Sequence, residues 1–309
     1  MIARMYQPRR LSHSEFIPLR GLEHHVRIWG DLGSGQDPIV MLHGWMDVGA
    51  SFQFVVDALT TDRPVIAPDW RGFGLTDSRG ADNFWFPDYL ADLDGLLDHY
   101  LQDRPADIVG HSMGGNISMF YAGARPQRVR RLVNLEGFGM PRTQPEQAPG
   151  RYAKWMDELK SLQRGELDLQ TYPEAAGVAR RLMRTNPRLP QDKADWLATH
   201  WAAPTTRADG SPAWRILGDA AHKIVNANLY RVDEALELNK AIAAPVLAVQ
   251  AADGVLQTWK KRGIDDDFVA RLRAVPRLEF ARMEDAGHMM HHDRPDEVAR
   301  LIEGFLKRN

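Results

Sequence analysis

The sequence predicts an α/β protein: a mostly parallel sheet with helices on both faces and a helical insertion. Short apolar runs alternate along the 309-residue chain with segments whose apolar residues recur at helical spacing. This alternation is typical of strands joined by crossover helices. It stops at Met140 and resumes after Lys240. We therefore expect a core domain of residues 1–139 and 241–309 and a helical cap domain of residues 140–240.

The predicted strands are short and continuously apolar, as strands covered on both faces are. The first two lie within residues 16–30, are joined at Arg20-Gly21, and show alternation at Val26 and Ile28. The continuous runs follow at residues 38–42, 64–68, 108–109, 129–135, 245–249 and 277–283. Helical segments separate most of these runs, so the sequence predicts parallel pairing through crossovers.

Helices are predicted where apolar residues recur every three or four positions. The expected helices cover residues 51–60, 87–101, 116–124 and the segment from Pro295 onward. In the last of these, Val298, Leu301 and Phe305 lie on one face, and a proline near the start is typical of a helix N-terminus. The insertion contains helical segments broken by Pro and Gly, and we place it at the carboxyl edge of the sheet, where such folds bind ligands.

Composition limits the partners of the chain. The net charge of −2 gives no electrostatic basis for binding nucleic acid or an anionic membrane. The absence of cysteine excludes disulfides, thiolate metal sites and cysteine nucleophiles. No run approaches the roughly 20 apolar residues of a membrane span, and no signal peptide is recognisable. We expect a cytoplasmic protein with a small-molecule substrate, no cofactor and no metal, and the sequence leaves its oligomeric state open.

One stretch, residues 108–115, has the spacing G-x-S-x-G between a buried strand and a helix. Gly110, Ser112 and Gly114 occupy the fixed positions. A serine at the apex of such a turn sits on a strained backbone with its hydroxyl pushed out of the sheet. Glycine on either side fits because strand and helix approach too closely there for a Cβ. Ser112 is therefore the candidate nucleophile.

A serine hydroxyl needs a base to take its proton during attack. His288 lies between the last predicted strand and the closing helix, where a histidine is needed, and is the candidate base. We interpret the other histidines as surface or packing residues, including His24, His25, His99, His200 and His222. His291 and His292 are expected to be solvated or to support the loop that carries His288.

The base in turn needs a carboxylate to hold its tautomer and stabilise the imidazolium. Two positions are open: Glu136, which follows the strand 129–135, and Asp253, which follows the strand 245–249. Asp253-Gly254 is also a good turn dipeptide, whereas a carboxylate directly after a buried strand is costly unless it is paired. We favour Glu136 and keep Asp253 as the alternative.

An oxyanion hole requires two backbone N–H groups, one from the residue after the nucleophile and one from the loop after an earlier strand. Met113 and Trp45 occupy these positions. We expect His43 to brace the Trp45 loop through hydrogen bonds, and residues 69–71 to fix the turn beneath the site.

Together, these motifs resemble the α/β-hydrolase fold superfamily. They are His43-Gly44-Trp45, the segments 69–74 and 110–115, and Ala286-Gly287-His288, and they occur in that family's order. The stretch 42–52 is most similar to the serine hydrolase-like proteins. The resemblance implies an eight-stranded sheet, Ser112 as nucleophile, His288 as base, and the amides of Trp45 and Met113 as oxyanion hole.

A second likeness concerns the acid. Residues 135–141 and 251–256 resemble the corresponding segments of haloalkane dehalogenases. Some of those enzymes carry their catalytic acid as a glutamate at the place of Glu136. They use an aspartate nucleophile, however, and the ether that Ser112 would form with their substrates could not be cleaved by water. Dehalogenase and epoxide hydrolase chemistry are therefore disfavoured.

The predicted function is that of a carboxylesterase-like serine hydrolase, which cleaves a carboxylic ester through an acyl-enzyme. The same triad would serve a thioester, amide, lactone or C–C bond, and a perhydrolase side reaction. The alternative from another class is a ligand-binding or signalling protein with a hydrolase pocket and little turnover. The complete set of serine, histidine and carboxylate favours the enzyme.

Overall fold

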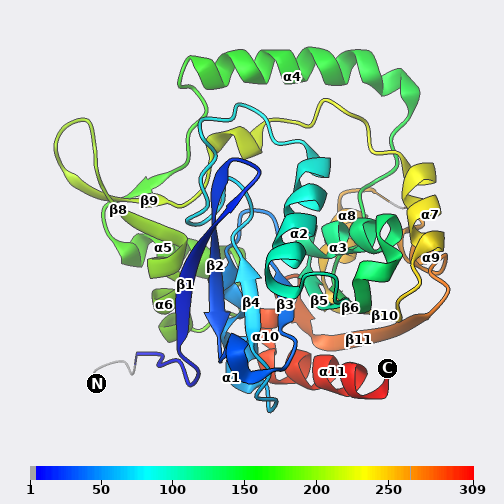
Figure 1. The fold of residues 1–309 in the computed structure, drawn as a ribbon. Coiled ribbons are helices and arrows are strands. Elements are labelled where there is room, and N and C mark those ends of the chain that lie inside the picture. Colours follow the sequence, from blue (N-terminus) through cyan, green and yellow to red (C-terminus); the bar gives the residue numbers. More distant parts are fainter. Residues whose placement is uncertain (1–4, 265) are drawn as a thin grey trace.

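The computed structural model describes residues 5–264 and 266–309 (Figure 1). One eight-stranded sheet has the order β1-β2-β4-β3-β5-β6-β10-β11. Its strands are β1 (Ser12–Leu19), β2 (Leu22–Trp29), β3 (Ile39–Leu42), β4 (Val65–Pro68), β5 (Ala106–His111), β6 (Val129–Leu135), β10 (Val246–Asp253) and β11 (Leu278–Gly287). β2 is antiparallel to β1 and β4, and the other pairs are parallel. The mostly parallel eight-stranded sheet is confirmed.

Helices cover both faces of this sheet. Successive strand residues point to opposite faces, and apolar residues on each face pack against the helices there. Val40 and Leu42 of β3 pack into one apolar core, and Ile39 and Met41 pack into the other. The first core contains residues of α2 (Phe86–Leu101) and α3 (Met113–Ala124). The second contains residues of α1 (Gln53–Ala58), α10 (Met290–Asp293) and α11 (Pro295–Arg308). The helices on both faces are therefore also confirmed.

The region 140–240 contains a small sheet as well as helices. Its helices are α4 (Ala148–Gln163), α5 (Ala175–Thr185), α6 (Gln191–Trp201) and α7 (Val232–Ala241). Its strands β7 (Thr171–Tyr172), β8 (Ala202–Thr206) and β9 (Pro212–Ile216) form an antiparallel sheet in the order β7-β9-β8. The sequence indicated no strand here because β8 and β9 mix buried, partly covered and exposed residues and contain no continuous apolar run.

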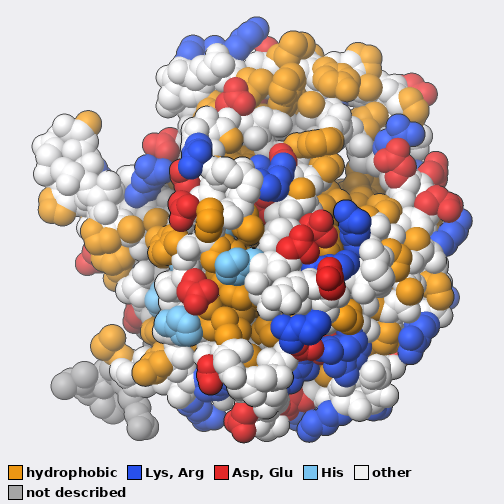
Figure 2. Space-filling view, in the orientation of Figure 1, with side chains coloured by type: hydrophobic (Ala, Val, Ile, Leu, Met, Phe, Trp, Pro, Cys, Tyr) orange, Lys and Arg blue, Asp and Glu red, His pale blue; other side chains and the backbone are white. Residues whose placement is uncertain are grey.

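Two helices of this region differ in their contacts. α7 packs against α3, where a Cβ added to Gly123 would overlap the backbone of Leu238. α4 has no buried residue and crosses the top of the molecule in Figure 1. Its Tyr152 and Met156 are half-exposed, and Figure 2 shows apolar side chains along this helix. Among the residues that the structure describes, no helix combines the length and apolar composition needed to cross a bilayer.

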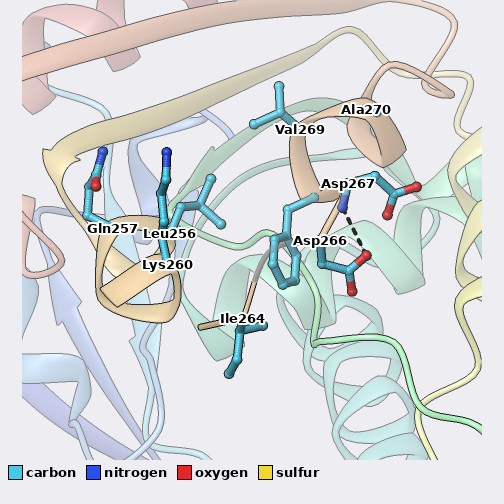
Figure 3. Close-up of a pocket in the computed structure, with 9 residues that line it drawn as sticks. Leu256, Gln257, Lys260, Ile264, Asp266, Asp267, Val269 and Ala270 are labelled. Atoms are coloured by element: carbon cyan, nitrogen blue, oxygen red, sulfur yellow. Dashed lines mark hydrogen bonds between the residues drawn. The ribbon is translucent and has the colours of Figure 1, made fainter. Parts of the chain in front are cut away.

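Two further short helices, α8 (Val255–Lys261) and α9 (Phe268–Leu272), follow β10. A pocket of about 220 Å³ lies between them, and Figure 3 shows its lining residues, with Leu256 and Lys260 on one side and Asp266 and Val269 on the other. The backbone N–H of Asp267 donates to the Asp266 carboxylate at its rim (Figure 3). None of the candidate site residues lines this pocket.

Candidate active site

Ser112 lies at the turn between β5 and α3, and its backbone has φ +52° and ψ −113°. The turn is tight: a Cβ at Gly114 would overlap the backbone of Leu42, and a Cβ at Gly110 would overlap the carbonyl of Gly114. The Ser112 N–H donates to the carbonyl of Leu135 at 2.8 Å, which fixes the turn to β6. Such a sparsely populated backbone conformation persists only where the surrounding structure enforces it.

His288 follows β11 and lies between a hydroxyl and a carboxylate. Its Nε2 is 3.0 Å from Ser112 Oγ, and its Nδ1 is 3.2 Å from Glu136 Oε2. Because a carboxylate only accepts, Nδ1 carries the proton, and Nε2 is left to accept the serine hydroxyl. About a third of the His288 side chain is exposed, so the ring can be reached from solvent.

Glu136 is fully enclosed: its side chain has 0% exposure. A buried carboxylate is tolerated only when its oxygens are hydrogen-bonded. Here Oε1 accepts the N–H of Ala251 at 2.8 Å, and Oε2 accepts the N–H of Val255 at 2.7 Å. The backbone of Glu136 has φ +60°, an uncommon conformation for a residue other than glycine. Two amides and one imidazole therefore hold this carboxylate.

Asp253 is placed differently. Its side chain is 61% exposed and forms an ion pair with Arg188 at 2.6 Å. Arg188 comes from the segment between α5 and α6. The hydrogen bonds of the His288 ring, within the described part of the chain, go to Ser112 and Glu136. The structure therefore brings Glu136, and not Asp253, to His288.

The two residues expected to supply oxyanion donors flank the serine. Met113 is the first residue of α3, so its N–H has no partner within the helix. Trp45 follows Gly44, at which an added Cβ would lie 3.2 Å from the Ser112 Cβ. The loop after β3 therefore passes close to the serine, and a side chain at residue 44 would crowd it.

His43 is buried and makes the bracing hydrogen bonds expected from the sequence. The Trp70 backbone N–H donates to its Nε2 at 2.9 Å, and the Trp70 indole N–H donates to its carbonyl at 3.0 Å. Its Nδ1 lies 2.7 Å from the Gly44 carbonyl, to which it must donate. Burial lowers the pKa of His43, which favours this neutral form.

The expectation that His291 and His292 are solvated is wrong. Both lie on α10 and are buried, with 0% and 2% exposure. The short helix turns the rings inward, where His291 packs on Phe52 and His292 on Phe54. This burial could not be predicted from the residues alone, because two adjacent histidines before a helix are equally compatible with a surface turn.

Comparisons with known proteins agree with the fold. The α/β hydrolase fold family matches residues 37–295. The chain is 26% identical to a serine hydrolase-like protein of Danio rerio, across 96% of this chain and 90% of that protein. It is 38% identical to the 2-hydroxy-6-oxo-2,4-heptadienoate hydrolase of Pseudomonas putida, across 36% of this chain and 40% of that protein.

A solved structure has the same fold. The thioesterase domain from the curacin biosynthetic pathway superposes with a TM-score of 0.80 at 22% identity, covering 95% of this chain and 99% of that one. The likeness extends through both the large sheet and the region 140–240, since nearly the whole of both chains is covered. From the match of residues 37–295, we conclude that the chain belongs to the α/β hydrolase fold family.

Proposed function

We propose that the protein is a serine hydrolase that cleaves a carboxylic ester through an acyl-enzyme. The observation that supports this most directly is the hydrogen-bonded chain from Ser112 Oγ through His288 to Glu136. A base within hydrogen-bonding reach of the nucleophile, itself oriented by a third group, is the arrangement that activates a serine.

In the proposed mechanism, Ser112 Oγ attacks the ester carbonyl while His288 Nε2 takes its proton. The Glu136 carboxylate stabilises the imidazolium that forms. The amides of Met113 and Trp45 donate to the oxyanion of the tetrahedral intermediate, and loss of one such donor typically reduces the rate by about 10²–10³-fold. His288 then protonates the leaving alcohol. In the second half of the reaction, His288 takes a proton from water as the water attacks the acyl-enzyme, and it returns that proton to Ser112 Oγ as the carboxylic acid leaves.

We propose an ester, although this triad could serve several other acyl substrates. One relative is named as a hydrolase of a dienoate and one structural neighbour as a thioesterase domain, so hydrolysis by related folds extends beyond oxygen esters. A carboxylic ester requires only the nucleophile, base, carboxylate and oxyanion donors described above. The choice is tested by comparing kcat/KM for matched oxygen esters, thioesters and amides of one acyl chain.

The first test is labelling with a fluorophosphonate, followed by intact-mass spectrometry. We expect one adduct on the native protein and none on Ser112→Ala, which should also lose about 10⁴-fold or more in ester turnover. A folded native protein that stays unlabelled would contradict the proposal. Release of about one equivalent of product per protein, with no further turnover, would instead favour a binding protein.

A further inference from the structure

Behind the serine lies a buried cluster formed by Asp47, His111 and His291. Their exposures are 3%, 1% and 0%. One potential ligand atom from each lies within 4.8 Å of the others, and Asp47 Oδ2 is 3.6 Å from His291 Nε2. The three residues come from separate segments: the loop after β3, the end of β5, and α10. The mechanism above gives none of the three a chemical step.

Several polar atoms of this cluster lack hydrogen-bond partners. Among the described residues these include Asp47 Oδ2, His111 Nδ1 and both ring nitrogens of His291. Buried polar atoms are normally satisfied, and leaving one unpaired costs about 1–3 kcal/mol. Four such atoms in one place require a physical explanation.

The remaining atoms of Asp47 and His111 are held firmly. His111 Nε2 lies 2.8 Å from the carbonyl oxygen of His288, which can only accept, so Nε2 carries the proton. In the neutral ring Nδ1 then carries a lone pair, and this atom has no hydrogen-bond partner among the described residues.

The carboxylate of Asp47 is oriented in the same way. Its Oδ1 accepts the N–H of Val48 at 2.9 Å and the hydroxyl of Ser51. Its other oxygen, Oδ2, has no hydrogen-bond partner among the described residues and lies 3.6 Å from His291 Nε2.

We propose that Asp47, His111 and His291 bind a divalent transition-metal ion of the zinc class. Two imidazole nitrogens and one carboxylate oxygen are ligands that zinc prefers, whereas Ca²⁺ and Mg²⁺ favour sites made of oxygen alone. A ligating histidine usually donates its other N–H to a carbonyl, and a ligating carboxylate is usually hydrogen-bonded. His111 and Asp47 show these two contacts.

The ion would act as a cross-link behind the catalytic residues. Asp47 is two positions after Trp45, His111 directly precedes Ser112, and His291 is three positions after His288. Each proposed ligand therefore lies within three residues of one part of the proposed catalytic machinery. The substrate does not need to touch the ion, so this inference stands independently of the reaction.

The test is zinc binding by the full chain. Protein stripped with a chelator is incubated with zinc for hours, because the ligands are buried, and is then analysed by native mass spectrometry and thermal unfolding. We expect one tightly held zinc per chain and, at a hundredfold excess over Kd, a rise in Tm of about 5 °C. Cobalt(II) should give absorption bands characteristic of a buried, low-coordination site.

Two variants identify the ligands. Asp47→Asn keeps an Oδ1 acceptor for Val48, and His291→Leu fills the buried space with an apolar side chain, so both should fold but lose the bound zinc and the rise in Tm. The matched control is His24→Gln, because His24 is also buried, has an unpartnered Nε2 and lies 3.9 Å from Asp92, but belongs to no potential metal-binding group among the described residues. This control should keep the zinc.

Three outcomes would overturn the proposal: no stoichiometric zinc in the wild-type protein, retention of zinc by both variants, or its loss from the His24 control. The first outcome would favour a direct contact between Asp47 and His291 with no ion between them. If the variants do not fold, X-ray absorption of the zinc-loaded wild type decides, because a coordination sphere without imidazole also excludes this site.

Discussion

The turn after β6, which begins at Glu136, and the turn at the end of β10, residues 251–255, place their acidic residues in opposite ways. The two strands are parallel neighbours, and an acid stands at the end of each. The Glu136 side chain is wholly buried, whereas that of Asp253 is 61% exposed. Position at the end of a strand therefore does not decide which carboxylate serves the histidine. The direction in which the backbone turns decides it.

The turn at the end of β10 contributes to the site through its backbone. Ala251 and Val255, which flank Asp253, donate their N–H groups to the carboxylate of Glu136. Hydrogen bonds from neutral donors to an ionised acceptor are stronger than those between neutral groups. The turn after β6 thus supplies the acid. The turn at the end of β10 supplies the cradle, which is the pair of N–H donors of Ala251 and Val255 that hold the acid in place.

The largest effect is expected for Glu136→Gln. The amide has no negative charge to stabilise the imidazolium. Its NH₂ group would also face the N–H of Ala251 or Val255, so that two donors meet without an acceptor. We expect kcat/KM for an ester to fall by about 10³-fold or more. A steady-state assay of both Glu136→Gln and Asp253→Asn checks the ranking of their kcat/KM values. A greater loss in the aspartate variant would mean that Asp253, and not Glu136, is the acid that serves His288.

A smaller but still large effect is expected for Gly254→Ala. A Cβ at this position would overlap the Glu136 carboxylate, so the carboxylate or the cradle must move. Because a displacement of about 1 Å in a catalytic group can cost roughly 10²-fold, we expect a loss of that order in kcat/KM. Gly150→Ala on α4 is the control, since nothing lies within 4 Å of its added Cβ. Equal activities of the two variants would argue against a rigid cradle.

Asn134 tests the turn that directs Glu136 inward. Its side chain is buried, accepts the Gly137 N–H at 2.9 Å and donates to the Gly137 carbonyl at 2.7 Å. Asn134→Ala leaves both backbone groups unpaired, so we expect the free energy of unfolding to fall by about 1–3 kcal/mol, measured by urea denaturation. A loss of activity at a temperature where the variant is fully folded would show that this turn also positions Glu136. Unchanged stability would mean that other contacts fix the turn.

The smallest effect is expected for Asp253→Asn and Arg188→Gln. This ion pair is exposed, and such pairs contribute about 0–1 kcal/mol, which salt screens further. Ester turnover should remain within about threefold of the wild type, and the unfolding free energy within about 0.5 kcal/mol. A salt titration checks the physical cause, since any residual difference should vanish at high ionic strength.

Much of the fold was predictable because the large sheet obeys local rules. The apolar runs at 129–135 and 245–249 became neighbouring strands, and the helix predicted from Pro295 begins at that residue. Ser112 and His288 were identified because the chemistry requires a nucleophile in a tight turn and a base after the last strand. The structure brings these two side chains within 3.0 Å.

Other features depend on contacts between distant segments, which periodicity does not encode. The choice between Glu136 and Asp253 depends on one positive φ and on amides more than a hundred residues away. The burial of His291 depends on Phe52 from the opposite end of the chain. The strands β7, β8 and β9 form a separate small sheet in which β9 pairs with both of the others, and their partly exposed residues form no apolar run.

The sheet order also has a consequence for biosynthesis. β6 and β10 are neighbours, yet the whole segment from α4 to α7 separates them in the chain. Since ribosomes add about 5–20 residues per second, the edge of β6 waits for seconds before its partner emerges. An open strand edge invites mispairing, so the interval favours chaperone binding or aggregation. His288 follows the last strand, and the nascent chain therefore acquires its base only after that interval has passed.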